Sequence, residues 1–171
     1  MERFVREEAE TARANRDRSA GSPEPGRPPN IAELLHGPFQ ILVDELHEGL
    51  AEAGYPDIRP AHGNVFGYIR KEGSRLTELA ERAQLTKQTM GYLVDYLEER
   101  GYVKREPDPG DKRAKIVRLT GEGRELVGVA REIMGRIEAR WAELLGEDRM
   151  EQLRELLKEL NVQAGKQTPP R

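Results

Sequence analysis

The sequence predicts a mainly α-helical fold with one small β-hairpin, and two features of its pattern support this. After residue 30, apolar residues recur at intervals of three and four over most of the chain, as in amphipathic helices. Only residues 102–119 change to short β-prone runs on either side of a turn-rich segment. At 171 residues the chain fits one domain with appendages.

The composition excludes several classes of protein. The chain has no cysteine, which rules out disulfides, thiolate zinc sites and cysteine nucleophiles. No G-x-S-x-G, Walker or H-E-x-x-H motif is present, so we expect neither an enzyme nor a cofactor. No apolar run approaches the roughly 20 residues that span a bilayer, and the acidic start of the chain is unlike a secretory signal. We therefore expect a cytoplasmic protein without a membrane partner.

The three histidines do not have the spacing of a metal site. His36 and His47 are 11 residues apart on one predicted helix, which separates them by roughly 16 Å along its axis. No cluster of Asp, Glu or His at ligand spacing accompanies His62. We expect solvated or packed histidines and no bound metal.

The first 58 residues are expected to form a tail and a helix. Residues 1–30 contain few large apolar side chains and end in a proline-rich stretch, which indicates a mobile tail and linker. From Ile31 the spacing of apolar residues predicts a long helix with a kink at Pro38. Gly54 and Pro56 are expected to end this helix.

Three shorter helices are expected next. One follows Pro60, a residue that suits the first turn of a helix, and ends near Gly73. A short helix over residues 76–83 has Thr77 as its expected cap. Thr86 is expected to cap a longer helix that ends at Gly101, where glycine favours the left-handed backbone conformation.

The hairpin and two long helices complete the chain. Residues 102–105 and 115–119 are the expected strands, with residues 107–111 as the turn between them. Thr120 is expected to cap a long amphipathic helix, and a final helix is expected after Gly146.

The predicted elements of residues 59–120 have the order of a winged helix-turn-helix. A short helix is followed by a three-residue turn, a longer helix and a hairpin with a charged tip. In that fold the second helix enters the major groove of DNA. Gln88 is suited to bond the edge of adenine, and Lys87 to bond guanine or a phosphate. The side chains expected to face DNA from this helix are Thr86, Lys87, Gln88, Thr89, Gly91 and Tyr92.

The predicted hairpin adds positive charge beside that helix. Residues 59–119 contain 13 Lys and Arg against 9 Asp and Glu, a balance of +4, whereas the whole chain has a formal charge of -3. An arginine at the tip of such a wing enters the minor groove, where negative potential is enhanced. We expect Arg113 to do so with its guanidinium held by Asp111. Lys104, Arg105, Lys112 and Lys115 are the other wing residues expected at DNA, although Lys104 and Arg105 also fit a solvated strand face.

Four runs of residues carry a resemblance to a known family. They are Leu85–Met90, Leu97–Arg105, Asp108–Arg113 and Val117–Gly123, and they resemble the MarR family of bacterial transcription regulators. The resemblance implies that Asp111 and Arg113 are the family's Asp-x-Arg motif of the wing. It also implies a repressor released by a small aromatic or anionic ligand.

The resemblance further implies a homodimer that reads a palindrome with two winged lobes. Helices over residues 31–58 and 121–163 would intertwine as the dimerisation platform, with residues 164–171 as a flexible tail. The sequence supports this independently, because these helices are too long and too apolar for one small winged core to cover.

Two further expectations concern a ligand crevice and an alternative function. Aromatic placement alone suggests that Phe39, His62, Phe66 and Trp141 line a crevice for the small ligand. The alternative to a DNA-binding regulator is a winged-helix adaptor that binds another protein and not DNA, since helix-turn-helix folds are reused for such contacts.

Overall fold

The computed structural model describes residues 28–167 and divides the chain into two compact units, residues 1–39 and 40–171. The tail expected over residues 1–30 therefore falls, up to residue 27, outside the described residues. Helix α2 (Ile31–Glu52) follows Asn30, whose Oδ1 accepts hydrogen bonds from the N–H groups of Ala32 and Glu33 at 2.9 and 3.1 Å. The predicted first helix is confirmed, and it runs through Pro38.

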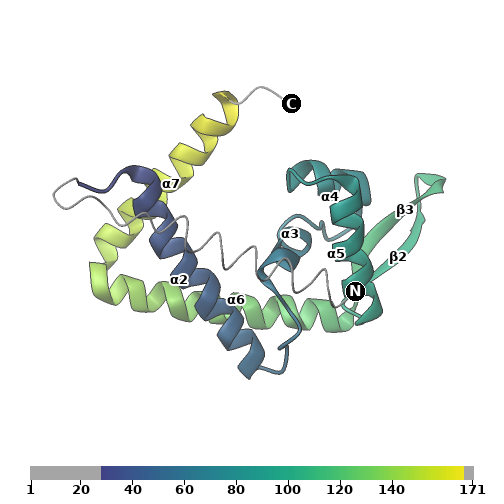
Figure 1. The fold of residues 1–171 in the computed structure, drawn as a ribbon, viewed down its shortest axis with the longest axis horizontal. Helices are drawn as coiled ribbons and strands as arrows, with labels where there is room; N and C mark the ends of the chain where they lie inside the picture. The colour runs from purple at the N-terminus through teal and green to yellow at the C-terminus, as the bar shows by residue number, and fades with distance from the viewer. Residues whose placement is uncertain (1–27, 168–171) are drawn as a thin grey trace. The chain divides into compact units, whose positions relative to one another are not determined.

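The second unit contains a lobe of helices, in which α3 (Gly63–Phe66) and α4 (Leu76–Arg82) lie beside α5 (Lys87–Glu99) (Figure 1). The helix expected from Pro60 to near Gly73 is shorter than predicted and ends at Phe66, next to Gly67, a residue type that favours helix poorly. The apolar residues Val65, Met90, Val94 and Leu97 are fully buried in this lobe. Phe66, Ile69 and Leu93 are partly buried against them. The elements of this lobe are η1 (Pro60–His62), α3 (Gly63–Phe66), α4 (Leu76–Arg82) and α5 (Lys87–Glu99).

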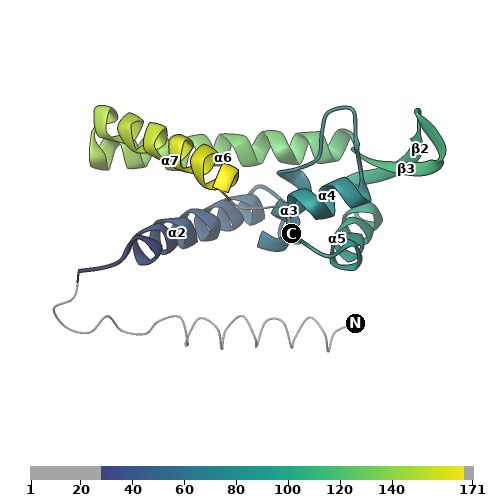
Figure 2. The same cartoon turned by 90° about the horizontal axis from the view of Figure 1, so that it is seen from above.

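Two long helices follow the lobe. Helix α6 (Gly121–Leu145) is capped as predicted by Thr120, whose Oγ1 accepts a hydrogen bond from the N–H of Gly123 at 3.0 Å. Helix α7 (Glu147–Gln167) turns back from the end of α6 (Figure 2). It continues past residue 163 to Gln167, into the segment expected as a tail. No helix in the described part of the chain is long and apolar enough to cross a membrane.

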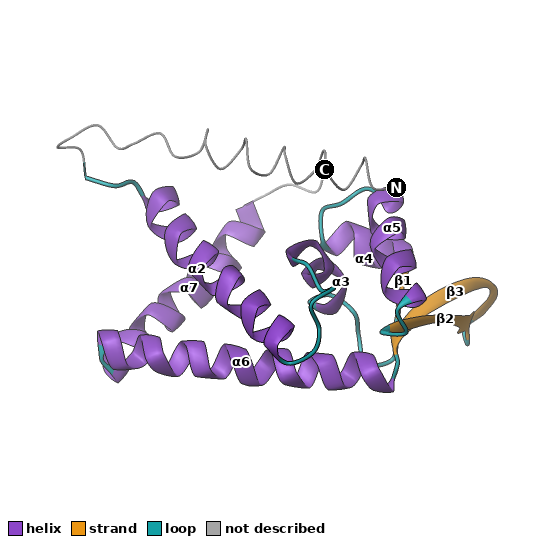
Figure 3. Ribbon diagram, turned by 60° about the horizontal axis from the view of Figure 1, so that its bottom comes forward, coloured by secondary structure: helices purple, strands orange, loops and turns teal. Residues whose placement is uncertain are grey.

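The predicted hairpin is confirmed as part of a three-stranded antiparallel sheet that extends beside α5 (Figure 3). Strands β2 (Val103–Asp108) and β3 (Asp111–Leu119) are longer than expected. Strand β1 (Ser74–Arg75) pairs with β3 at Val117 and Ile116, which gives the order β1-β3-β2. Two residues are too few to show alternation, which is why the sequence did not predict β1.

The start of α4 differs from the expectation. Thr77 is not the cap, because it lies inside the helix. Arg75 is the residue before the first turn, with extended backbone, and its N–H donates to Glu78 Oε2 at 3.3 Å. The carboxylate three residues into the helix therefore does the capping that the sequence assigned to a hydroxyl.

Candidate nucleic-acid interface

Helix α5 exposes the face that the sequence assigned to DNA. Thr86 caps it as predicted, because its Oγ1 accepts a hydrogen bond from the N–H of Thr89 at 3.1 Å. Met90, Val94 and Leu97 are buried on the opposite side and fix the rotation of the helix. The predicted residues Thr86, Lys87, Gln88, Thr89 and Tyr92 are therefore exposed, and Gly91 is half-buried.

A hydrogen bond on this face orients the side chain with the best base-reading chemistry. Gln88 Nε2 donates to the hydroxyl of Tyr92 at 3.0 Å, one turn further along α5. The amide then keeps one N–H donor and its oxygen acceptor, which is the pair that bonds the edge of adenine. Tyr92 is 62% exposed, so this pair of side chains lies on the surface.

The far end of α5 is anchored to the segment before η1. Asp57 Oδ2 lies 3.1 Å from Arg100 Nε, and Asp57 Oδ1 accepts a hydrogen bond from the hydroxyl of Tyr102 at 3.1 Å. Burial and that hydrogen bond raise the pKa of Tyr102 to about 12. The guanidinium of Arg100 stacks over the ring of Tyr96 at 3.4 Å. These contacts attach the C-terminal end of α5 to the rest of the lobe, and none of them involves its first turns.

The basic residues of the interface fall into two groups. Lys87, Arg113 and Lys115 are exposed, and among the described residues no ion pair or hydrogen bond engages their charged groups. The side chain of Lys112 lies outside the described part of the chain. The charges of the first three are therefore available to a polyanion.

The second group is paired within the protein. Lys104 Nζ lies 2.6 Å from Glu106 Oε1 and lowers the pKa of that carboxyl. Arg105 is held by Asp95 at 2.7 Å and by Glu98, both on α5. The expected DNA contacts of Lys104 and Arg105 stay predictions, and each must compete with an existing pair.

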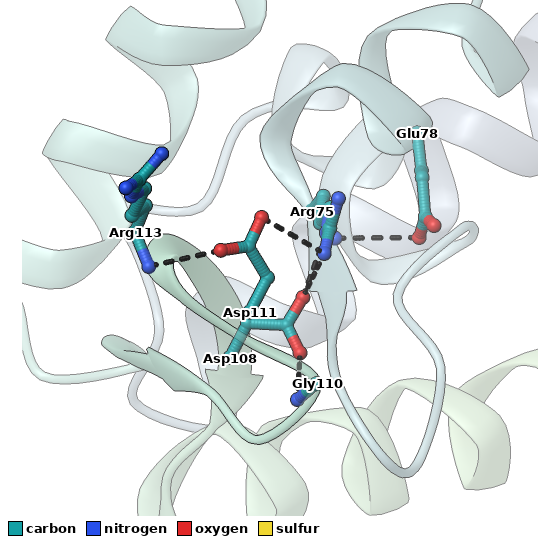
Figure 4. A network of polar contacts seen from close by, with 6 residues as sticks. All are labelled: Arg75, Glu78, Asp108, Gly110, Asp111 and Arg113. Atoms are coloured by element: carbon teal, nitrogen blue, oxygen red, sulfur yellow. Dashed lines mark hydrogen bonds and ion pairs between the residues drawn. The ribbon is translucent and has the colours of Figure 1, made fainter.

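The wing aspartate does not act as expected. Asp111 Oδ1 accepts a hydrogen bond from the main-chain N–H of Arg113 at 3.0 Å and does not hold its guanidinium (Figure 4). An aspartate two residues before an N–H commonly forms such a turn. Asp111 therefore shapes the backbone that carries Arg113, and the side chain of Arg113 projects freely.

A second aspartate binds a residue that the sequence did not single out. Asp108 Oδ2 accepts a hydrogen bond from Arg75 Nε at 2.7 Å, and Asp108 Oδ1 accepts one from the N–H of Gly110 at 2.8 Å. The Gly110 hydrogen bond and then Arg75 lower the pKa of Asp108. Arg75 and Asp108 are 33 residues apart, so no local pattern links them.

The residues suggested for a ligand crevice differ in how deeply they are buried. His62 is 4% exposed, stacks on Tyr96 with ring centroids 4.5 Å apart, and accepts a hydrogen bond at Nδ1 from the N–H of Arg59. Phe66 and Trp141 are partly buried against the core. Phe39 is 59% exposed and belongs to the first unit. Their role in ligand binding stays a prediction.

These features define the class of protein. A capped helix exposes polar side chains after a short helix and turn, and a hairpin with unpaired cations lies beside it. This is a winged helix-turn-helix of the kind that binds DNA.

Comparison with known proteins gives the family. A model of the MarR family matches residues 57–114. The transcriptional regulator HosA of Escherichia coli O157:H7 is 34% identical over 98 residues, which cover 52% of this chain and 73% of HosA. HosA of Escherichia coli O111:H- is 37% identical over 76 residues, which cover 44% of this chain and 56% of that protein. The chain belongs to the MarR family of transcription regulators.

Solved structures agree with this assignment. MarR from Escherichia coli in its apo form has 26% identity and a TM-score of 0.65, over 78% of this chain and 98% of MarR. The transcriptional repressor CouR bound to a 23-mer DNA duplex has 25% identity and a TM-score of 0.64, over 77% and 92%. CouR from Rhodococcus jostii RHA1 bound to p-coumaroyl-CoA has 27% identity and a TM-score of 0.62, over 78% and 91%. These relatives are regulators, which supports the expectation that this chain is not an enzyme.

Proposed function

We propose that this protein binds double-stranded DNA as a homodimer, with α5 in the major groove and the hairpin of β2 and β3 at the minor groove of a pseudo-palindromic operator. The observation that carries the proposal is the exposure of three unpaired cations, Lys87, Arg113 and Lys115, on α5 and the adjoining hairpin. Neutralising phosphates with such groups releases counterions and supplies much of the affinity for DNA.

The chemistry of α5 supports sequence reading in addition to charge. The first turn of the helix presents N–H groups and the side chain of Lys87, both suited to phosphate. Gln88, oriented by Tyr92, offers a donor and an acceptor to an adenine. Arg113 at the wing tip has the charge and freedom to enter a narrow minor groove.

Exposed apolar side chains support a homodimer. Helix α7 exposes Leu153, Leu156 and Leu160, and Leu144 in the last turn of α6 is 75% exposed. In the first unit, Ile31 and Leu34 are also exposed. Apolar faces of this length on a single chain indicate an interface with another copy. Two copies would place two α5 helices about 34 Å apart, one turn of DNA.

Repression and release by a small ligand are the finer part of the proposal. CouR, a structural neighbour, is described as a repressor and has been solved with p-coumaroyl-CoA. A small aromatic or anionic ligand would release DNA only by binding more tightly to a dimer whose lobes are wrongly spaced for the operator. Phe66 and Trp141 are the candidate contacts in the second unit.

Selection of bound duplexes from a random library, followed by titration of the selected site at several salt concentrations, tests the proposal. We expect a pseudo-palindrome whose affinity falls steeply with salt. Gln88→Ala should relax the base preference at one position in each half-site. Arg131→Ala, which removes an exposed charge on α6, is the control and should leave the selected sequence unchanged. Absence of any salt-sensitive affinity for duplex would favour the adaptor instead.

A further inference from the structure

Arg75 joins three parts of the winged lobe. It is the last residue of β1, it immediately precedes α4, and its side chain reaches the end of the hairpin. Arg75 Nη2 lies 2.6 Å from Asp108 Oδ2 and 3.8 Å from Asp111 Oδ2. The side chain of Asp108 is 14% exposed and that of Arg75 is 42% exposed, so the carboxylate of this pair is shielded from water and the guanidinium is partly solvated. Short charge-assisted contacts of this kind are stronger than neutral hydrogen bonds.

In both Asp108 and Asp111, one carboxylate oxygen contacts the backbone of the turn and the other faces Arg75. Oδ1 of Asp108 accepts from the N–H of Gly110, and Oδ1 of Asp111 accepts from the N–H of Arg113. The Oδ2 atoms face Arg75 (Figure 4). The carboxylates that shape the turn are thus the same groups that the guanidinium of Arg75 holds.

The wing tip, residues 107–115, receives little support from the sheet. The ladder between β2 and β3 is regular only as far as Pro107 and Lys115, and a register shift follows. Strand β1 pairs with β3 at Ile116 and Val117 and not beyond. Among the described residues, the contacts from Arg75 are the only ion pairs or side-chain hydrogen bonds that tie the wing tip to another element.

We propose that Arg75 is a positioning residue that fixes the wing tip, and with it Arg113, at a set distance from the reading helix α5. This inference rests on the proposed function for its effect on DNA, but its effect on the wing itself is independent of DNA. Arg75 lies at the start of α4, which packs on α5. One guanidinium therefore connects the hairpin, proposed for the minor groove, to α5, proposed for the major groove. Operator binding then needs the carboxylate of Asp108.

The direction in which Asp108→Asn changes DNA affinity distinguishes positioning by Arg75 from simple electrostatics. Asp108→Asn removes a negative charge from a surface that faces a polyanion, so charge alone predicts tighter binding to any duplex. The asparagine keeps the Oδ1 acceptor for Gly110 but loses the ion pair with Arg75. Positioning therefore predicts weaker binding to the operator, together with equal or tighter binding to random duplex.

The matched control is Glu106→Gln. Glu106 lies on the same strand and pairs with Lys104 and Arg118, not with Arg75. This variant removes the same charge and frees two cations, so it should tighten binding to operator and random duplex alike.

The experiment measures both affinity and wing geometry. Because the chain has no cysteine, Pro109→Cys and Glu99→Cys place one spin label on the wing tip and one on α5 of each chain, and mixing with an excess of unlabelled protein leaves one labelled chain in a dimer. Without DNA, we expect a narrow distance distribution in the parent and a broad one after Arg75→Ala or Asp108→Asn. Operator affinity should fall about tenfold in both variants. An unchanged distribution, or an Asp108→Asn variant that tightens operator binding as Glu106→Gln does, would overturn the proposal. If the parent binds no operator, the proposed function fails, and the distance distribution still decides the role of Arg75.

Discussion

Arg105 connects strand β2 to helix α5, because its Nη2 lies 2.7 Å from Asp95 Oδ1 and its guanidinium also pairs with Glu98. The N–H of Arg105 donates to Glu98 Oε1 at 2.7 Å. The side chain of Arg105 is 21% exposed, whereas Arg113 on the same hairpin is exposed and has no charged partner among the described residues. Two arginines that the sequence placed together at DNA thus occupy opposite environments.

Substitution should separate stability from DNA binding at these two positions. Arg105→Ala leaves Glu98 and Asp95 without their cation, so we expect the free energy of unfolding to fall by about 2 kcal/mol. Arg113→Ala should change it by less than about 0.5 kcal/mol and weaken operator binding by about 1–3 kcal/mol. Urea unfolding and fluorescence anisotropy measure the two effects. Equal losses of stability in both variants would contradict this division.

Local chemistry explains which parts of the fold the sequence could predict. Thr86 and Thr120 were recognised as caps because a hydroxyl next to its own helix needs no distant partner. The Thr77 prediction failed because Glu78 caps α4 through the N–H of Arg75. Cap identity depends on which side chain reaches the free N–H groups, and several nearby residues compete for them.

Distance along the chain explains what the sequence missed at the candidate site. The pair of Arg75 and Asp108 spans 33 residues and depends on β1, a strand of two residues. The expected pairing of Asp111 with the guanidinium of Arg113 is not formed in this structure, where Asp111 Oδ1 accepts from the main-chain N–H of Arg113 and Oδ2 faces Arg75. Composition could place charge on the wing, but only the three-dimensional arrangement shows which charges are already neutralised.

Dimer formation should depend on the exposed face of α7. Leu156 is 65% exposed, and Leu153 and Leu160 lie on the same helix. We expect Leu156→Glu to shift the protein from dimer to monomer, because burying an unpaired carboxylate in an interface is costly. Sedimentation equilibrium over a range of concentrations measures this. Asn161→Glu, which adds the same charge to an exposed position, should remain dimeric; an intact dimer after Leu156→Glu would count against α7 as the interface.

Gly123 is required where α6 begins. A Cβ at this position would lie 2.0 Å from the carbonyl oxygen of Tyr102, which also accepts a hydrogen bond from the N–H of Thr120 at 3.1 Å. Because that obstacle is backbone, we expect Gly123→Ala to lower the free energy of unfolding by about 3 kcal/mol. Gly121→Ala is the control, since its Cβ would meet only Arg124 Nη2 at 4.0 Å. Urea unfolding that shows similar stability for both variants would refute the close approach.

His62 should make the protein less stable in mild acid. Burial, and then the positive charge of Arg59, lower its pKa from 6.5 to about 4 in the folded protein, although Asp57 opposes this. Between those two values the unfolded chain binds a proton that the folded protein excludes, so the free energy of unfolding falls as the pH falls. The contribution is complete above pH 6.5 and is lost by about pH 4, at a cost of about 3 kcal/mol.

Comparison with a variant isolates this histidine from the carboxylates that also titrate in acid. His62→Gln keeps an acceptor within reach of the N–H of Arg59 and does not titrate. Between pH 7 and pH 4, the free energy of unfolding of the parent should therefore fall further than that of the variant. A difference between the two that stays constant with pH would mean that the folded protein protonates His62 as readily as the unfolded chain, and that the stacked ring beside Tyr96 does not exclude the charge.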